Sequence, residues 1–163
     1  MRWGITGAAA VTVLVAAVII RTQLIDTVTV SSDSMDPTVC TGDTVVLARL
    51  DHDTAIKVDD IVTFPSPADG LPAIKRVVAV AGQSVAIQDA QLIVDGREVQ
   101  EPYVDHASID GVYTATVTVP QGDVFVMGDR REISIDSREY GPIPTSIIDG
   151  RMIMKLWSEC ETR

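Results

Sequence analysis

The chain has 163 residues, of which 46% are apolar, and this length predicts one main domain with room for a small insertion. All 23 acidic residues lie beyond Arg21, together with 11 of the 13 basic ones, so this part carries a formal net charge of −12. Such an acidic surface argues against nucleic-acid binding and against docking by charge onto anionic lipid.

The first segment of the chain is apolar enough to cross a membrane. Residues 3–20 are 18 residues without a charge, and as a helix they would span roughly 27 Å, the thickness of a hydrocarbon core. Arg2 and the amino terminus favour a cytoplasmic N-terminus, with everything after Arg21 exported. A cleaved signal peptide also begins this way, but the run is longer than usual and no small-x-small site follows it. We therefore predict a single-pass anchor.

The rest of the chain carries short β-strand patterns. The Asp95-Gly96 pair between alternating apolar runs predicts a hairpin. No sustained helical periodicity occurs outside the apolar N-terminal segment, so we expect a mainly β domain, a sandwich or a coiled barrel. The predicted strands are 25–30, 44–49, 59–64, 73–80, 85–87, 91–94, 97–99, 113–119, 124–127 and one or two within 147–157.

A serine-rich stretch follows the first predicted strand. It reads Ser32-Asp33-Ser34-Met35-Asp36-Pro37-Thr38, and its proline ends regular pairing. Ser and Asp favour turns for their local hydrogen bonds, so the stretch alone is typical of an ordinary turn. Its other interpretation is a nucleophile, which requires a base within hydrogen-bond reach.

A lysine is the candidate base. The two histidines, His52 and His106, lie in polar contexts without G-x-S-x-G, HExxH or a Cys/His cluster, so neither a triad nor a metal site is indicated. Lys75 is the one lysine inside a strongly apolar strand, whereas Lys57 and Lys155 are predicted to be peripheral. Burial would lower its pKa toward neutrality. The alternative is a cation on an edge strand that keeps its head in water.

The two cysteines, Cys40 and Cys160, are far apart in the sequence and have no metal-type spacing. An exported location would permit a disulfide, but two cysteines form no framework. We therefore expect two small unpaired thiols.

Four sequence boxes together resemble those of bacterial type I signal peptidases. The stretch 32–38 is similar to the family's S-x-S-M-x-P-T box. Gly42-Asp43 together with residues 59–64 resembles the family's next box. Ile74-Lys75-Arg76-Val77 resembles the lysine box, and residues 128–138 resemble the G-D-N-R-x-x-S-x-D-S-R box. The boxes occur in the family's order behind an apolar segment, and the resemblance spans roughly residues 30–157.

The resemblance implies a catalytic role for four residues. Ser34 matches the nucleophile that forms an acyl-enzyme, and Lys75 matches the general base. Ser32 matches a hydroxyl that, with the backbone N–H of Ser34, donates to the oxyanion; losing one such donor costs ~10²–10³ in rate. Ser134 matches a serine that orients the lysine head.

The resemblance also implies supporting and substrate-binding residues. The supporting residues are Asp129, Arg131, Asp136 and Arg138, which without the resemblance would be interpreted as a solvated charged loop. Val30, Ser32, Met35 and Ile74 fall where small apolar pockets would accept the Ala-x-Ala residues of a signal peptide bound by β-augmentation.

The implied architecture is a signal-peptidase-like coiled antiparallel β-sheet domain with one transmembrane helix ahead of it. We expect an anchor at 1–22 and an extracytoplasmic peptidase domain at 23–163, with its core at about 25–80 and 124–158 and a small β insertion at about 81–123. The implied partners are the signal peptides of exported preproteins and the lipid bilayer. No metal, cofactor or nucleic acid is expected.

Some residues depart from the family pattern. Arg130 stands where the family usually has Asn, Glu132-Ile133 replaces more polar residues, and residues 81–84 lack the usual Pro-Gly-Asp character. A general enzyme and a specialised paralogue with restricted substrates therefore both stay open. A catalytically silent binding domain should lack Ser34 or Lys75, and a self-cleaving repressor-type domain should have a DNA-binding region before the serine.

Overall fold

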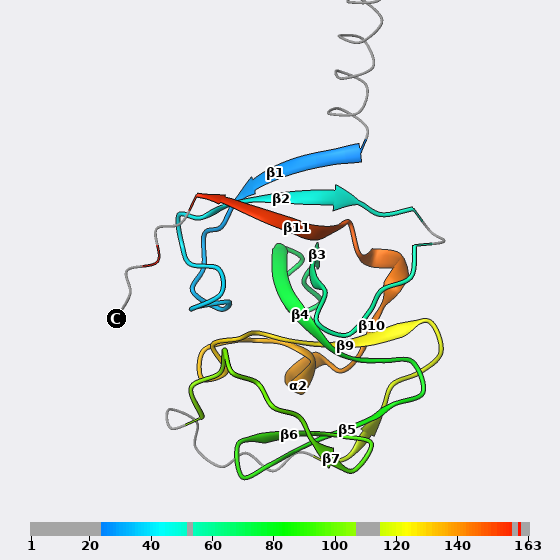
Figure 1. Cartoon of the computed structure of the whole chain (residues 1–163). Coiled ribbons are helices and arrows are strands. Elements are labelled where there is room, and N and C mark those ends of the chain that lie inside the picture. Colours follow the sequence, from blue (N-terminus) through cyan, green and yellow to red (C-terminus); the bar gives the residue numbers. More distant parts are fainter. Residues whose placement is uncertain (1–23, 52–53, 107–114, 158–159, 161–163) are drawn as a thin grey trace, which may run out of the picture.

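The computed structural model describes residues 24–51, 54–106, 115–157 and 160. Its strands and short helices alternate with tight turns along the chain (Figure 1). The strands are β1 (Ile25–Thr29), β2 (Thr44–Arg49), β3 (Ile61–Pro65), β4 (Pro72–Val80), β5 (Ser84–Gln88), β6 (Gln91–Val94), β7 (Arg97–Glu98), β8 (Val117–Thr118), β9 (Asp123–Met127), β10 (Ile143–Pro144) and β11 (Gly150–Trp157), and the helices are α2 (Ser137–Tyr140) and the 3₁₀ turn η2 (Thr145–Ile147).

Two antiparallel sheets make up the described fold. The larger has seven strands in the order β1-β2-β11-β3-β4-β9-β10, and the smaller has four in the order β7-β6-β5-β8. Figure 1 shows β1, β2 and β11 in one layer, β4 curving away from that layer toward β9, and the small sheet at the far end. The prediction of a mainly β, coiled antiparallel fold is confirmed. The one-turn helix α2 is too short to show a periodicity in the sequence.

The hairpin predicted at Asp95-Gly96 is present. β6 and β7 pair directly on either side of it, with Val94 opposite Arg97. Both turn residues have positive φ, 52° at Asp95 and 73° at Gly96, as the two-residue turn that matches strand twist requires.

Three apolar clusters hold the sheets together. One fills the space between the small sheet and β4 and β9, around Leu92 and Phe125. A second lies under the loop after β1 and includes Val30 and Met35. The third surrounds Phe64, which is fully buried between β3, β4 and β9. The last two clusters support the loop after β1, which carries the predicted nucleophile, and β4, which carries the predicted base.

Two predicted segments fall wholly or partly outside the described residues. The anchor at 3–20 lies there, as does the first part of the strand predicted at 113–119, of which Val117–Thr118 is seen as β8. Within the part of the chain that the structure describes, no helix has the length and apolar character needed to span a bilayer.

We predict that Phe64→Ala lowers the free energy of unfolding by about 3–5 kcal/mol, because it removes an aromatic ring from a filled core and leaves a cavity. Urea titration of the detergent-solubilised chain, followed by circular dichroism, measures this loss. Leu71→Ala is the control, since Leu71 is 63% exposed and should change the value by less than about 0.5 kcal/mol. Equal losses in the two variants would contradict the assignment of Phe64 to the core.

Candidate active site

The predicted nucleophile and base meet in the structure. Lys75 lies on β4, and Ser34 lies on the loop between β1 and β2, which brings residues 41 positions apart into contact. Lys75 Nζ is 2.8 Å from Ser34 Oγ, and the two residues are 5% and 8% exposed. Ser32 Oγ lies 3.2 Å from Ser34 Oγ. A nucleophile, a buried amine and a second hydroxyl therefore converge on one point.

Burial determines the protonation of Lys75. Its neighbours on β4 are buried, and its partner across the strand pair is the fully buried Val62. Desolvation lowers the pKa of Lys75 below its ordinary value, and Arg138 lowers it further, while Asp136 and Asp129 act in the opposite direction. The alternative of an edge cation with its head in water is wrong, because the Lys75 side chain is buried, although at this residue β4 pairs with β3 alone among the described strands.

The residue after Lys75 makes the first of three buried ion pairs. Arg76 donates Nε to Asp129 Oδ1 at 2.9 Å and Nη2 to Asp129 Oδ2 at 2.7 Å, and its guanidinium lies 3.9 Å from the centre of the Tyr103 ring. The Thr38 hydroxyl donates to the same carboxylate. Asp129 thus links β4 to the loop that carries the nucleophile.

The second pair lies inside the segment 128–138. Arg138 donates Nε to Asp136 Oδ1 at 2.8 Å and Nη2 to Asp136 Oδ2 at 2.9 Å. Asp136 also caps α2 by accepting the Arg138 N–H, and it accepts the Gly128 N–H at 2.9 Å. Arg138 in turn donates to the carbonyls of Arg131 and Ser134. These bonds fold the segment into a fixed shape.

The third pair joins this segment to residues beyond β7. Arg131 pairs with Glu101, and the two side chains are 2% and 0% exposed. Tyr103 donates its hydroxyl to the same Glu101 oxygen at 3.2 Å. Burial, with Glu101 nearby, raises the pKa of Tyr103, which keeps its hydroxyl a neutral donor. The interpretation as a solvated charged loop is wrong for Asp129, Arg131, Asp136 and Arg138, since each is ion-paired and its side chain is at most 14% exposed.

Gly128 allows this segment to approach the nucleophile. A Cβ at Gly128 would lie 2.5 Å from the Ser34 carbonyl oxygen and 2.5 Å from Ser134 Cβ, so no larger residue fits without a shift. The backbone N–H of Arg130 donates to the same Ser34 carbonyl at 3.1 Å. The structure therefore places Ser134 beside the nucleophile loop.

Ser134 lacks its predicted contact in this structure. Its hydroxyl is buried, yet within the described part of the chain it has no hydrogen-bond partner, and so the predicted bond to Lys75 is not formed. A buried hydroxyl without a partner carries a desolvation penalty. Its role in orienting Lys75 stays a prediction.

The predicted substrate-binding residues lie together beneath the dyad. Val30, Met35 and Ile74 are 5%, 0% and 9% exposed and belong to one apolar cluster with Leu47. A pocket of about 460 Å³ lies along β1 and β4. Val28 and Pro72, which help to line it, come two residues before Val30 and Ile74 in the sequence. The apolar surface next to Ser34 therefore extends along β1 and β4.

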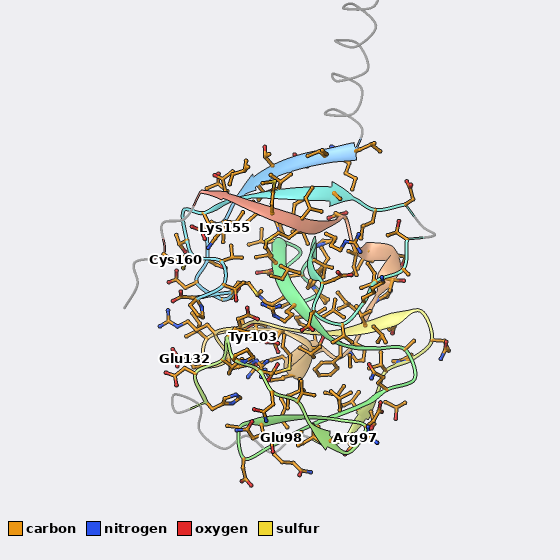
Figure 2. All side chains as sticks on the ribbon, in the orientation of Figure 1. Arg97, Glu98, Tyr103, Glu132, Lys155 and Cys160 are labelled. Carbon is orange, nitrogen blue, oxygen red and sulfur yellow. A yellow bond between two sulfur atoms is a disulfide. The ribbon has the colours of Figure 1, made fainter. Side chains whose placement is uncertain are left out.

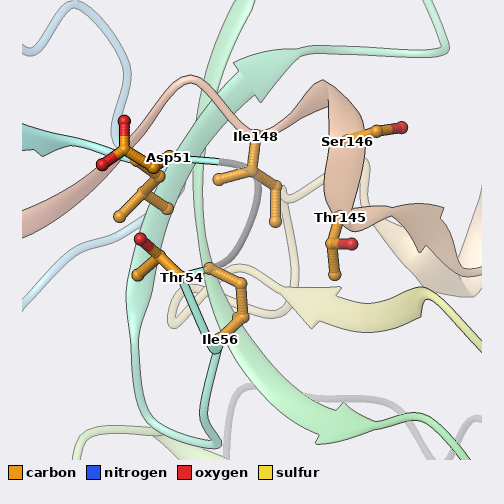
Figure 3. A pocket seen from close by; sticks show the side chains of 7 residues that line it. Asp51, Thr54, Ile56, Thr145, Ser146 and Ile148 are labelled. Atoms are coloured by element: carbon orange, nitrogen blue, oxygen red, sulfur yellow. The ribbon is translucent and has the colours of Figure 1, made fainter.

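A second pocket has no connection to these residues. It measures about 120 Å³ and is lined by the side chains shown in Figure 3, among them Ile56, Thr145 and Ile148. None of the predicted site residues lines it.

The expectation of two unpaired thiols is wrong. Cys40 and Cys160 form a disulfide across a sequence separation of 120 residues, with their Cα atoms 5.5 Å apart. Asp36 lies beside both sulfur atoms, and in the described residues these three are the one close group of metal-type ligands. Because the sulfurs are bonded to each other, they are not thiolates that could bind a metal.

The departure at Arg130 changes the surface beside the nucleophile. Its guanidinium lies 2.9 Å from a Glu132 oxygen and 3.6 Å from an Asp36 oxygen, so it bridges two segments. The asparagine that the family usually has there could not make such an ion pair.

Three contributors to the site escaped prediction: Thr38, Glu101 and Tyr103. Thr38 belongs to the serine-rich stretch 32–38, but its bond to Asp129 joins residues that are 91 positions apart in the sequence. Glu101 and Tyr103 flank a proline outside any strand pattern, and no local periodicity distinguishes them from a loop. The sequence signal for these buried ion pairs is the number of charged residues close to the predicted apolar strands.

Comparisons with known proteins agree with this geometry. The model of the family described as signal peptidase, peptidase S26, matches residues 3–157. Over 161 residues the chain is 33% identical to signal peptidase I V of Bacillus subtilis (strain 168), which covers 91% of this chain and 94% of that protein. It is 32% identical to thylakoidal processing peptidase 1, chloroplastic, of Arabidopsis thaliana, covering 91% of this chain but 47% of that protein, so it spans about half of that relative's length.

A solved structure shares the fold. The crystal structure of a signal peptidase I from Enterococcus faecalis V583 superimposes with a TM-score of 0.53 at 30% identity. The match covers 60% of this chain and 97% of the other.

We predict that hydrolytic activity of the site rises with pH. Protonated Lys75 cannot accept the Ser34 proton, so activity is lost below the lowered pKa of Lys75 and gained as pH rises through it. The kcat/KM profile of the full chain measures this limb. A flat profile from acid to alkaline pH would argue against Lys75 as the base.

We predict that Glu101→Gln lowers the free energy of unfolding by about 3–5 kcal/mol, because it leaves the buried Arg131 guanidinium without its counter-charge. Chemical denaturation measures the loss. Glu98→Gln makes the same change at an exposed position on β7 and should cost less than about 0.5 kcal/mol. If Glu101→Gln behaved like its control, the pair would not be a structural brace.

Proposed function

We propose that Ser34 and Lys75 form a catalytic dyad that removes signal peptides from exported preproteins. The basis is that the chain belongs to the type I signal peptidases of peptidase family S26. Members of this family are serine endopeptidases. The observation that carries the proposal is the 2.8 Å contact between Lys75 Nζ and Ser34 Oγ at a site where both residues are buried. Burial lowers the pKa of Lys75, so a larger fraction of it is neutral at a given pH and able to act as a general base.

The proposed chemistry follows from this contact. Neutral Lys75 accepts the proton of the Ser34 hydroxyl as Oγ attacks the scissile carbonyl carbon. The Ser34 N–H and the Ser32 hydroxyl, whose oxygen lies 3.2 Å from Ser34 Oγ, donate to the oxyanion that develops. Protonated Lys75 then gives its proton to the leaving amine, and water releases the acyl group from Ser34 by the same base catalysis.

The proposed substrate path is the free edge of β4 next to Lys75. In the described residues, Pro72–Lys75 pair with β3 only, because pairing with β9 begins at Arg76. An extended peptide can add to this edge by backbone hydrogen bonds, with alternate side chains entering pockets. Val30, Met35 and Ile74 form an apolar floor there that suits small residues at an Ala-x-Ala site. The pocket along Val28 and Pro72 would accept the substrate residues that precede the Ala-x-Ala site.

The proposed placement in the cell follows from the sequence. Residues 1–22 would anchor the protein as a single span with a cytoplasmic N-terminus, and residues 23–163 would form the extracytoplasmic peptidase domain. Within it, residues of about 25–80 and 124–158 would form the catalytic core and about 81–123 the small β insertion. A cleft held near the membrane surface meets a signal peptide as it emerges.

The test is cleavage of a detergent-solubilised preprotein with an Ala-x-Ala site by wild type, Ser34→Ala and Lys75→Ala. We expect wild type to cut after the second Ala and each variant to lose about 10³-fold or more of kcat, because neither dyad member works alone. Mass spectrometry identifies the cut, and circular dichroism verifies folding. Ser66→Ala, on an exposed turn after β3, should keep wild-type activity. Folded variants that still cleave would exclude the dyad.

A further inference from the structure

The nucleophile lies on a loop rather than on a strand. The loop runs from Val30 to Asp43, and two backbone bonds close its base: Val30 N–H to the Asp43 carbonyl and Gly42 N–H to the Val30 carbonyl, each at 2.8 Å. Lys75, by contrast, is fixed by a strand of the large sheet. The distance between nucleophile and base therefore depends on what holds this loop.

The last strand of the chain reaches over to the loop. Lys155 on β11 lies 3.2 Å from a carboxylate oxygen of Asp43, which is fully buried, and donates to the Thr38 carbonyl at 3.1 Å. The same Asp43 oxygen accepts the Cys40 N–H at 2.9 Å. Lys155 thus contacts the loop on both sides of Cys40.

The disulfide ties the same two segments covalently. Cys40 lies six residues after Ser34, and Cys160 lies three residues after the end of β11. Cys160 Sγ is 3.9 Å from Lys155 Nζ, so the two ties adjoin each other. Figure 2 shows Lys155 and Cys160 together at the side of the domain, next to the loop between β1 and β2.

The loop is also held by the segment 128–138. The Thr38 hydroxyl donates to Asp129, and the Ser34 carbonyl accepts the Arg130 N–H. Thr38 therefore connects Lys155, through its carbonyl, with Asp129, through its hydroxyl. The loop that carries Ser34 is thus anchored by two different parts of the chain, the segment 128–138 and β11.

We propose that Lys155, Asp43 and the Cys40–Cys160 disulfide are a clamp that positions Ser34 against Lys75, so that the reduced enzyme is a folded but poor catalyst. This inference rests on the proposed function. Reduction by a dithiol transfers two electrons and two protons, breaks the Sγ–Sγ bond, and leaves two thiols and a cyclic disulfide of the reagent. The ion pair of Lys155 with Asp43 and its hydrogen bond to the Thr38 carbonyl remain as non-covalent ties between β11 and the loop.

The first experiment compares the oxidised and dithiothreitol-reduced full chain in detergent, with kcat and KM measured on the Ala-x-Ala preprotein. We expect kcat to fall about tenfold on reduction while KM stays the same, because a small displacement of a reacting atom costs rate rather than binding. Reoxidation should restore kcat. Cys40→Ser/Cys160→Ser should match the reduced enzyme and no longer respond to the dithiol.

The pH profile separates positioning from a merely structural role. A loosened loop admits water to Lys75, so the acid limb of the activity profile should move to higher pH on reduction. The other charged groups that act on Lys75 are Asp129, Asp136 and Arg138, and their contacts do not include the disulfide. A bond that only stabilised the fold would lower the melting temperature and leave this limb in place.

Lys155→Met tests the clamp with the disulfide intact, which covers the case of a double serine variant that fails to fold. Its matched control is Arg151→Met on the same strand. Arg151 pairs with Asp60 at 3.4 Å, and Asp60 lies outside the loop of residues 30–43. We expect Lys155→Met to lower kcat and shift the acid limb, and Arg151→Met to do neither.

The outcomes separate this inference from the proposed function. If the oxidised wild type does not cleave the preprotein, the proposed function fails. If it cleaves, but reduction and Lys155→Met leave both kcat and the acid limb unchanged, the clamp is refuted and the peptidase assignment stands. Loss of thermal stability alone would also refute the clamp.

Discussion

The proposed dyad depends on one constraint: an amine must be kept neutral in contact with a hydroxyl. Burial of Lys75 favours this state by lowering its pKa, because charging an amine in an apolar sheet is unfavourable. Two carboxylates, Asp136 and Asp129, act against this by raising the pKa. Each is held in a two-pronged ion pair by its own arginine, Asp129 by Arg76 and Asp136 by Arg138. Both arginines therefore brace the site, and Arg138 also lowers the pKa of Lys75, which favours its neutral form.

The three buried ion pairs also explain why these segments fold together. A buried ion pair contributes little net stability compared with apolar packing, but removing one partner is costly. Arg76 joins β4 to the segment 128–138, Arg131 joins that segment to the residues after β7, and Arg138 pairs within the segment. The pairs thus specify how the small sheet and the segment beside the dyad attach to the large sheet.

The sequence predicts this fold where the information is local. Alternating apolar residues located most strands, Asp95-Gly96 located a hairpin, and the family boxes located Ser34 and Lys75. Contacts set by packing between distant segments had no local signal. Glu101 meets Arg131 across 30 residues, and Cys40 meets Cys160 across 120. Spacing alone could not pair the two cysteines, because the strand after Cys40, β2, and the strand before Cys160, β11, become neighbours only in the folded sheet.

The two members of the dyad are held in different ways, and this difference accounts for the contacts around them. Lys75 is held by its strand, since β4 pairs with β3 at this residue and the side chain is buried. Ser34 has no strand pairing, yet catalysis demands that a nucleophile be placed within about 0.5 Å of its productive position. The loop compensates with side-chain ties to two separate parts of the chain, the segment 128–138 and the C-terminal strand. Precision at the proposed catalytic loop is thus supplied by long-range contacts, which is why sequence patterns singled out Ser34 without revealing what holds it.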